Sequence, residues 1–221
     1  MAVLRHRIRR AALTAALLLG PALLSGCLDL FKPATPAPPT ATGGVLVPTN
    51  YGTPDKTLAT MAAAMANKNA TNGNGADAWI GAFANPATDN LTPVFVFDPG
   101  VLVDLGITDP AWNLTLERNF YVKLPLLDTH AYYLTWAPWA PCGNDEDLPD
   151  GTAIRPRTYR LYTVDGSGNT LGTMALGIAK LTFKQVGTRW VITQWVDLAD
   201  PAADPSDNNQ VCFSRRRLSL Q

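Results

Sequence analysis

Histidine, cysteine and long apolar stretches are scarce in this chain of 221 residues. The sequence has two histidines and three cysteines, and only His130 among the histidines lies beyond the first 26 residues. A catalytic cysteine needs a base beside it, and no strand–turn–helix signature surrounds Cys142 or Cys212. The longest apolar run, 11–24, is shorter than the ~20 residues that cross a bilayer, and Gly20-Pro21 interrupts it. The sequence therefore predicts neither a thiol enzyme nor a membrane-spanning helix.

Basic residues are also fewer than acidic residues after the first 26 residues. The chain has 18 basic and 18 acidic residues, but four arginines precede position 27, which leaves 14 basic against 18 acidic. This mildly acidic balance disfavours nucleic acid or an anionic membrane surface as a partner. The one basic cluster, Arg215-Arg216-Arg217, is expected to be a solvated strand end, with a phosphate-binding patch as the alternative.

The segment Leu24-Ser25-Gly26-Cys27 closes the apolar run, which itself follows arginines at positions 5, 7, 9 and 10. A basic start, an apolar stretch and a small-residue cleavage site in this order are typical of a secretory signal. The cysteine behind the small residues resembles the lipobox of bacterial lipoproteins. This resemblance implies that residues 1–26 are a signal peptide and that Cys27 carries lipid. Because Leu28 stands where an aspartate would retain the protein, it also implies the outer membrane if the source is Gram-negative.

A proline-rich stretch follows the expected lipidation site, with prolines at positions 33, 36, 38 and 39. Repeated prolines favour an extended polyproline geometry because they deny hydrogen bonds to helices and sheets. Residues 27–52 are therefore expected to be the lipid anchor and a linker, and residues 53–221 a single folded domain. The protein is expected to be exported and to meet the membrane through its lipid alone.

Cysteine pairing and acidic loops give two further expectations. With Cys27 lipidated, Cys142 and Cys212 remain as a pair in an oxidising compartment, which predicts a disulfide. Such a bridge would bring two acidic loops together, and carboxylate oxygens suit Ca²⁺. The candidate calcium ligands are Asp145, Asp147, Asp204 and Asp207. No EF-hand spacing is present, and the alternative is a pair of solvated loops without any cofactor.

Helix signals come first in the domain and strand signals follow. Thr53-Pro54-Asp55 supplies an N-cap, a first-turn proline and an acid, and an apolar stripe of helical spacing comes next. A short helix with Trp79, a strand at 94–97 and a helix opened by Asp109-Pro110 are then expected. Four later strands are predicted, at 129–136, 157–164, 171–186 and 190–198. This order predicts an α+β domain with an antiparallel sheet.

The same order resembles nuclear-transport-factor-2-like domains. The resemblance rests on TPDKTLATMAAAMANKNA at the opening, WNLTLERNF as the third helix and GIAKLTFKQVGTRWVITQWVDLAD as the closing hairpin. It implies N-terminal helices packed on a strongly bent antiparallel sheet that forms a cone with a pocket, although the insert 137–153 departs from the compact form. Such domains include isomerase-like and dehydratase-like enzymes as well as binding and dimerising members, so the fold does not select a function.

Strand alternation selects the candidate site residues. Asp128, His130 and Tyr132 are expected on one strand face together with Trp136, where a carboxylate, an imidazole and a phenol can supply a general base and a proton donor. Trp190, Ile192, Gln194 and Val196 are expected on one face of the last strand. The alternative is that His130 ends its strand and the aromatic side chains form the core.

Two classes of function remain open from the sequence. The first is a non-catalytic envelope lipoprotein whose cone binds an apolar ligand, a protein partner or a second copy, with Trp136, Trp139, Trp190 and Trp195 as candidate binding residues. The second is an isomerase, dehydratase or hydrolase that acts through Asp128, His130 and Tyr132. A polar pair buried in an open apolar pocket would favour the enzyme, and a pocket filled by its own side chains would favour binding or assembly.

Overall fold

The computed structural model describes residues 46–68, 73–203 and 211–221. All of them belong to one compact unit of the chain. The predicted signal peptide, the lipidation site Cys27 and most of the predicted linker lie outside the described residues and stay predictions. None of the described helices combines the length and the hydrophobicity needed to cross a membrane.

The helices precede most of the sheet along the chain. Helix α2 (Pro54–Ala66) begins where the sequence predicted, because the Thr53 side chain accepts a hydrogen bond from the backbone N–H of Lys56. The side chains that α2 buries include Leu58, Met61 and Met65, which confirms the predicted apolar stripe. The other elements before the long strands are α3 (Gly75–Ile80), α4 (Pro86–Asp89), α5 (Pro99–Leu105), α6 (Leu114–Lys123) and the 3₁₀ turn η1 (Leu124–Leu126).

Helix α6 begins later than the Asp109-Pro110 pair predicted. Asn113 caps it by accepting hydrogen bonds from the backbone N–H groups of Thr115 and Leu116, at 2.9 and 3.1 Å. The Asp109 carboxylate is used instead in a local turn, where it accepts from Ala111 N at 3.1 Å. Ala111 has a positive φ of 43°, which is incompatible with a right-handed helix at that point.

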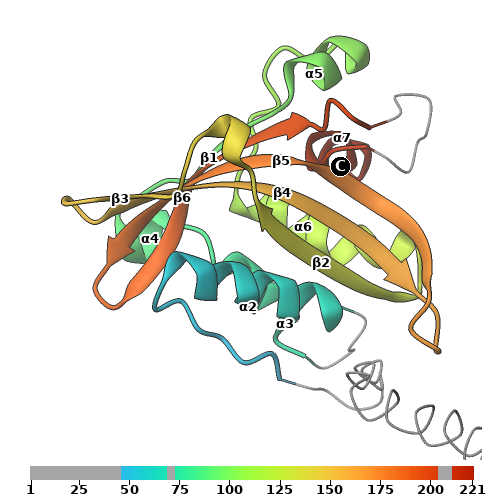
Figure 1. Ribbon diagram of the computed structural model, residues 1–221, viewed down its shortest axis with the longest axis horizontal. Helices are drawn as coiled ribbons and strands as arrows, with labels where there is room; N and C mark the ends of the chain where they lie inside the picture. The colour runs from blue at the N-terminus through green and yellow to red at the C-terminus, as the bar shows by residue number, and fades with distance from the viewer. Residues whose placement is uncertain (1–45, 69–72, 204–210) are drawn as a thin grey trace, which may run out of the picture. The chain divides into compact units, whose positions relative to one another are not determined.

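The sheet contains six strands in the order β1-β6-β5-β4-β2, with β3 paired to β4. The long antiparallel strands are β2 (Ala131–Pro138), β4 (Thr152–Val164), β5 (Thr170–Val186) and β6 (Arg189–Ala199). Strand β3 (Glu146–Leu148) forms a hairpin with β4 inside the predicted insert, and β1 (Val94–Val96) adds to β6 in parallel. Figure 1 shows β4 and β5 curving around the helices. The predicted α+β class, with N-terminal helices on a bent sheet, is confirmed, although β1 makes one edge parallel.

Two local features differ from the sequence prediction. A β-bulge lies in the β5–β6 pair, where Thr182 opposes Gln194 but Phe183 opposes Ile192. The extra residue reverses the alternation, so Trp190 and Ile192 do not share a face with Gln194 and Val196, and Trp195 is buried instead. The cluster Arg215-Arg216-Arg217 is also no strand end, because it lies in helix α7 (Phe213–Ser219).

Candidate functional site

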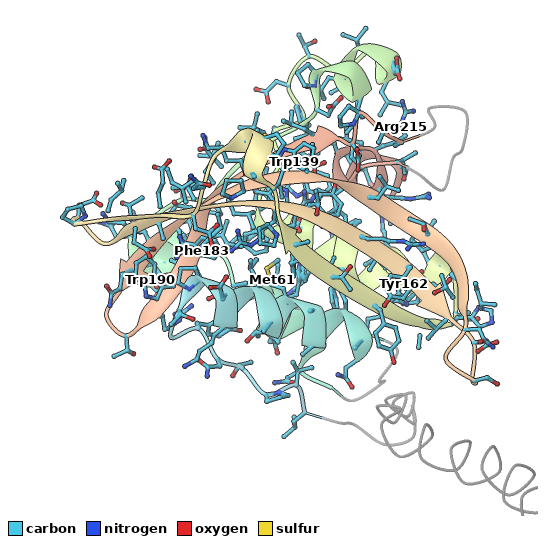
Figure 2. All side chains as sticks on the ribbon, viewed as in Figure 1. Met61, Trp139, Tyr162, Phe183, Trp190 and Arg215 are labelled. Atoms are coloured by element: carbon cyan, nitrogen blue, oxygen red, sulfur yellow. The ribbon has the colours of Figure 1, made fainter. Side chains whose placement is uncertain are left out.

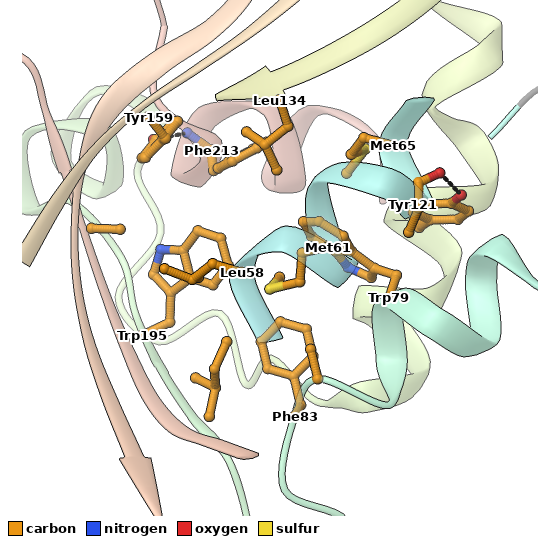
Figure 3. Packing of buried hydrophobic residues seen from close by; sticks show 14 of the residues in the cluster. Leu58, Met61, Met65, Trp79, Phe83, Tyr121, Leu134, Tyr159, Trp195 and Phe213 are labelled. Atoms are coloured by element: carbon orange, nitrogen blue, oxygen red, sulfur yellow. Dashed lines mark hydrogen bonds between the residues drawn. The ribbon is translucent and has the colours of Figure 1, made fainter. Parts of the chain in front are cut away.

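The inner face of the sheet is occupied by the protein's own aromatic side chains. Five aromatic residues, each at most 3% exposed, form what we call the aromatic core: Trp79, Phe83, Tyr159, Trp195 and Phe213. The Trp195 ring lies 5.6 Å from that of Phe213, which stacks at 4.5 Å on Tyr159 (Figure 3). Trp195 is therefore a core residue and is not available as a ligand anchor. Trp136 packs against it at 5.8 Å, and the Nε1 atoms of both are buried without a partner among the described residues.

A buried ion pair crosses this core. Glu117 of α6 and Arg217 of α7 are 0% and 1% exposed, and two nitrogens of Arg217 donate to the two carboxylate oxygens at 2.8 and 2.9 Å. The same carboxylate accepts the indole N–H groups of Trp79 and Trp112, at 3.1 and 2.8 Å. Burial acts to lower the pKa of Arg217, but Glu117, Asp197 and Tyr159 together act in the opposite direction, and the pKa is raised. Arg217 is therefore a charged core residue and not part of a phosphate patch.

A second buried polar group stands beside the first. The Asp197 carboxylate of β6 accepts hydrogen bonds from the hydroxyl of Tyr159 and from the hydroxyl of Ser214, both at 2.6 Å. Burial raises the pKa of Asp197 although Arg217 acts in the opposite direction, and burial likewise raises the pKa of Tyr159. Because each oxygen of Asp197 already has a partner within the protein, the group joins β4, β6 and α7 and leaves no open acid or base.

The predicted Asp128–His130 pair forms, but at the surface. The Nδ1 atom of His130 lies 2.6 Å from the Asp128 carboxylate, whose oxygen also accepts from the His130 backbone N–H at 2.9 Å. Burial acts to raise the pKa of Asp128, but His130 and Thr163 together act in the opposite direction, chiefly through hydrogen bonds, and the pKa is lowered. The His130 side chain is 52% exposed, because β2 begins only at Ala131. Asp128 and His130 therefore precede the strand on which they were predicted to lie.

Tyr132 points inward from β2, whereas the Asp128–His130 pair lies at the surface. It is fully buried, and its hydroxyl donates toward the carbonyl oxygens of Leu124 and Asp128, at 3.0 and 3.1 Å. Lys68 at the end of α2 places its Nζ atom 3.5 Å from the centroid of the Tyr132 ring. Burial lowers the pKa of Lys68 to about 7, whereas the Asp128 carboxylate acts in the opposite direction. This amine was not predicted from the sequence, because its burial depends on a strand more than sixty residues away.

An open groove lies where the β3–β4 and β5–β6 hairpins meet the start of α2. Its volume is about 500 Å³, within the range of about 300–1,000 Å³ that is usual for small-molecule sites. We call it the hairpin groove, and it is lined by Thr53, Pro54, Asp55, Asp147, Leu148, Pro149, Gly151, Arg155, Gln185 and Trp190. Trp190 is thus the one predicted binding residue that lines this groove. Figure 2 shows Trp190 at the β5–β6 hairpin. Trp139 lies well apart from it, directly before the 3₁₀ turn η2 (Ala140–Cys142).

Two arginines form the inner wall beside the groove. Arg155 and Arg157 alternate along β4 with Tyr159, so they share its inward face and are 6% and 5% exposed. Arg157 donates to the carboxylates of Asp55 and Asp145, and the hydrogen bond from Arg157 lowers the pKa of Asp145. Arg155 donates to Asp147 at 2.6 Å. The burial of Arg157 was not predicted from the sequence, although its spacing from Tyr159 along the strand is the signal that could have placed it inside.

These ion pairs use the carboxylates that were predicted to bind calcium. Asp145 and Asp147 face arginines, and Asp204 and Asp207 lie outside the described residues. Within residues 46–68, 73–203 and 211–221, no cluster of three acidic, histidine or cysteine side chains has the arrangement of a metal site. The calcium site stays a prediction that has no support from the described half of its ligand set.

The predicted disulfide between Cys142 and Cys212 is not formed, and both thiols are free. Cys142 is exposed in η2, where its sulfur accepts a hydrogen bond from the Trp139 indole at 2.9 Å. Cys212 is buried in a small cluster with Phe97 and Val101, and burial raises the pKa of its thiol to about 12. The predicted disulfide is wrong because Cys142 is exposed at the surface, whereas Cys212 is buried in a hydrophobic cluster. The number of cysteines in the sequence does not reveal these different surroundings.

Comparison with known proteins finds solved structures that are similar to this chain, but it assigns the chain to no family. No family model matches the sequence, and no curated protein matches it. A protein of unknown function from Mycobacterium tuberculosis is similar in structure, with a TM-score of 0.46 and 11% identity, over 75% of this chain and 90% of that one. A Thiobacillus denitrificans protein assigned as a calcium/calmodulin-dependent protein kinase type II association domain has a TM-score of 0.44 and 11% identity, over 68% and 97%. An NTF-2 like protein of unknown function from Shewanella oneidensis MR-1 has a TM-score of 0.38 and 13% identity, over 66% and 99%. All three TM-scores lie below 0.5, so the function of this chain has to be argued from its own residues.

Proposed function

We propose that this protein is a non-catalytic binding module of the bacterial envelope, anchored by lipid on Cys27, and that its ligand occupies the hairpin groove. The proposal that the groove binds a ligand depends on one observation, which is that some tryptophans lie in the core and another lines an open groove. Trp79 and Trp195 fill the inner face of the sheet, whereas Trp190 lines an open hollow of about 500 Å³. A substrate would have to displace the aromatic core to reach the inner face, but a ligand at Trp190 displaces only solvent.

The buried polar groups support the same division. Glu117, Arg217, Asp197 and Tyr159 are each paired within the protein and at most 3% exposed. A catalytic acid or base must be within hydrogen-bond reach of its substrate, and these groups are held behind aromatic rings. Their role is to fix the helices to the sheet, which keeps the groove at the hairpins in one shape.

An enzyme acting through Asp128, His130 and Tyr132 is the second candidate, and the 2.6 Å contact between Asp128 and His130 favours it. The geometry supports this enzyme hypothesis less well than it supports a binding site in the hairpin groove. The Tyr132 hydroxyl is directed to two backbone carbonyls, and the His130 side chain is about half exposed just before the start of β2. The pair therefore lacks the buried apolar surroundings that raise the reactivity of catalytic acids and bases.

The proposed binding site is tested by titrating the ¹⁵N-labelled full chain with a library of small fragments. Fragments that bind are expected to shift the indole resonance of Trp190 and to leave that of Trp195 unchanged. A library whose hits shift Trp195 and spare Trp190 would place the ligand inside the cone, and the proposed site would be wrong.

The proposed anchor is tested by metabolic labelling with palmitate in a bacterial host. The wild-type chain is expected to incorporate label and to fractionate with membranes, because several acyl chains hold a protein at a bilayer without a spanning helix. Cys27→Ser is expected to lose the label completely, whereas Cys142→Ser is expected to keep it. Label that persists in Cys27→Ser would refute lipidation at this cysteine.

A further inference from the structure

The polar groups of the hairpin groove are held in place before any ligand arrives. The Arg155 side chain is 7% exposed and donates through Nη1 to the carbonyl oxygens of Glu146 and Ile154, at 2.9 and 3.0 Å. Its Nη2 donates to Asp147 Oδ1 at 2.6 Å. The buried Nε atom has no hydrogen-bond partner among the described residues, since the nearest carboxylate oxygen, on Asp145, is 3.6 Å away. The guanidinium is therefore a fixed planar group that makes three of its five possible hydrogen bonds to described residues, which leaves one N–H on Nε and one on Nη2.

Carboxylate and amide oxygens complete the polar side of the groove. Asp55 and Asp147 each use one oxygen on an arginine, and in the described part of the chain the second oxygen of each has no hydrogen bond. Their side chains are 69% and 72% exposed, so these oxygens are open to a ligand. Gln185, opposite Trp190 in the β5–β6 ladder, presents its amide at the same opening and makes only a long 3.4 Å contact to Gly187 O.

An aromatic side chain forms the other wall. The backbone N–H of Trp190 donates to Tyr51 O at 2.7 Å, and its carbonyl accepts from the Thr57 hydroxyl at 2.9 Å, so both the start of α2 and the segment before it hold the residue. Its indole Nε1 makes no hydrogen bond to any described residue. Pro54, Leu148 and Pro149 add apolar surface beside the ring. Trp190 is partly buried and packs against the main hydrophobic core, so it offers the groove the part of its indole that stays accessible, with a donor that no described residue uses.

The charge at the groove restricts the ligand further. Asp55, Asp145 and Asp147 stand against Arg155 and Arg157, three carboxylates against two guanidinium groups, which leaves one negative charge. An anionic ligand would be repelled, and a purely apolar ligand would bury the open carboxylate oxygens without partners, at about 1–3 kcal/mol each. A neutral ligand with one apolar face and several hydroxyl groups satisfies both walls.

We propose that the hairpin groove binds a neutral saccharide, with a pyranose ring stacked on Trp190 and its hydroxyl groups bonded by Asp147, Asp55 and Gln185. The C–H faces of a sugar ring are apolar and match the indole, while adjacent hydroxyls match the two oxygens of a carboxylate and the planar amide. This inference rests on the proposed function, because it names the ligand class of the same groove.

The test is a titration of the lipidated full chain, in a detergent without a sugar head group, with maltose, cellobiose, mannobiose and N,N′-diacetylchitobiose. At least one disaccharide is expected to bind with a dissociation constant in the millimolar range or lower and to shift the Trp190 indole resonance. Trp190→Ala and Asp147→Asn are each expected to weaken binding by about tenfold or more, equivalent to about 1.4 kcal/mol. Trp139→Ala, which removes a half-exposed tryptophan outside the groove, is expected to leave binding unchanged.

Three outcomes overturn the inference: no disaccharide of the four binds, binding persists in both groove variants, or glucuronic acid binds more tightly than the neutral sugars. The fragment library separates these failures from failure of the proposed function. If charged or apolar fragments shift Trp190 while the disaccharides do not, the groove is a binding site for another class of ligand. If the only hits are at Trp195, the saccharide and the proposed binding site fail together.

Discussion

Replacing Arg217 by methionine is expected to lower the free energy of unfolding by about 3–5 kcal/mol. The substitution removes one member of a buried pair and leaves the Glu117 carboxylate, which is 0% exposed, without its countercharge. It also removes the guanidinium that lies 4.3 Å from the centroid of the Trp195 ring, a favourable cation–π contact. Denaturant unfolding of the full chain, followed by tryptophan fluorescence, measures the loss.

Arg215→Met is the matched control, because it removes the same charge two residues away in α7. Arg215 pairs with Asp104 at the surface, where the two side chains are 33% and 63% exposed, so a change below about 1 kcal/mol is expected. Glu117→Gln combined with Arg217→Met removes both charges and keeps a carbonyl acceptor for one of the two indoles, that of Trp79 or that of Trp112. That double variant is expected to be more stable than Arg217→Met alone. Equal losses for Arg217→Met and Arg215→Met would contradict the buried pair.

Trp195→Ala is expected to destabilise the protein by about 3–5 kcal/mol and to open a cavity in the aromatic core. Its ring contacts those of Phe83, Phe213 and Trp136, with centroids 6.2, 5.6 and 5.8 Å away, and these neighbours are fixed by strands and helices that cannot close the gap. Added indole should refill the space and raise the melting temperature of the variant, as binding to the folded state alone requires.

Two comparisons make this result specific. Trp139→Ala, at a partly exposed indole just before η2, is expected to change the stability by no more than about 0.5 kcal/mol, the usual size of a surface effect. The wild-type melting temperature is expected not to respond to indole. A rise in the wild-type protein that is accompanied by a shift of the Trp195 indole resonance would mean that the inner face already contains an apolar pocket, and the division between a filled interior and an open groove would be lost.

Local chemistry made part of this fold predictable. The threonine–proline–aspartate start of α2 and the break between the predicted strands 171–186 and 190–198 depend on a few neighbouring residues, so the sequence located both closely. The start of α6 was misplaced because Asp109-Pro110 and Asn113 both offer helix caps, and the positive φ of Ala111 between them decides in favour of Asn113. Such a backbone choice has no signature in residue type, since alanine rarely adopts it.

The candidate site was less predictable because it depends on contacts between distant segments. Arg217 was interpreted as solvated from its two arginine neighbours, and only Glu117, 100 residues earlier, explains its burial. Trp190 was identified as a binding residue, but the bulge opposite Thr182 and Phe183 decides that Trp195 lies in the core. Arg155 and Arg157 follow the inward alternation of β4, a pattern that is legible in the sequence once the strand is extended back to Thr152.

The most direct test of a filled interior and an open hairpin groove is to find where small ligands bind on the domain. The chain has six tryptophans, and single Trp→Phe variants assign each indole N–H resonance in a ¹⁵N spectrum of the full chain. With small neutral, charged and apolar fragments added in turn, the account predicts that binding shifts the resonance of Trp190 and leaves those of Trp79 and Trp195 in place. Fragments that shift Trp79 and Trp195 in the wild-type protein, with Trp190 unmoved, would contradict it.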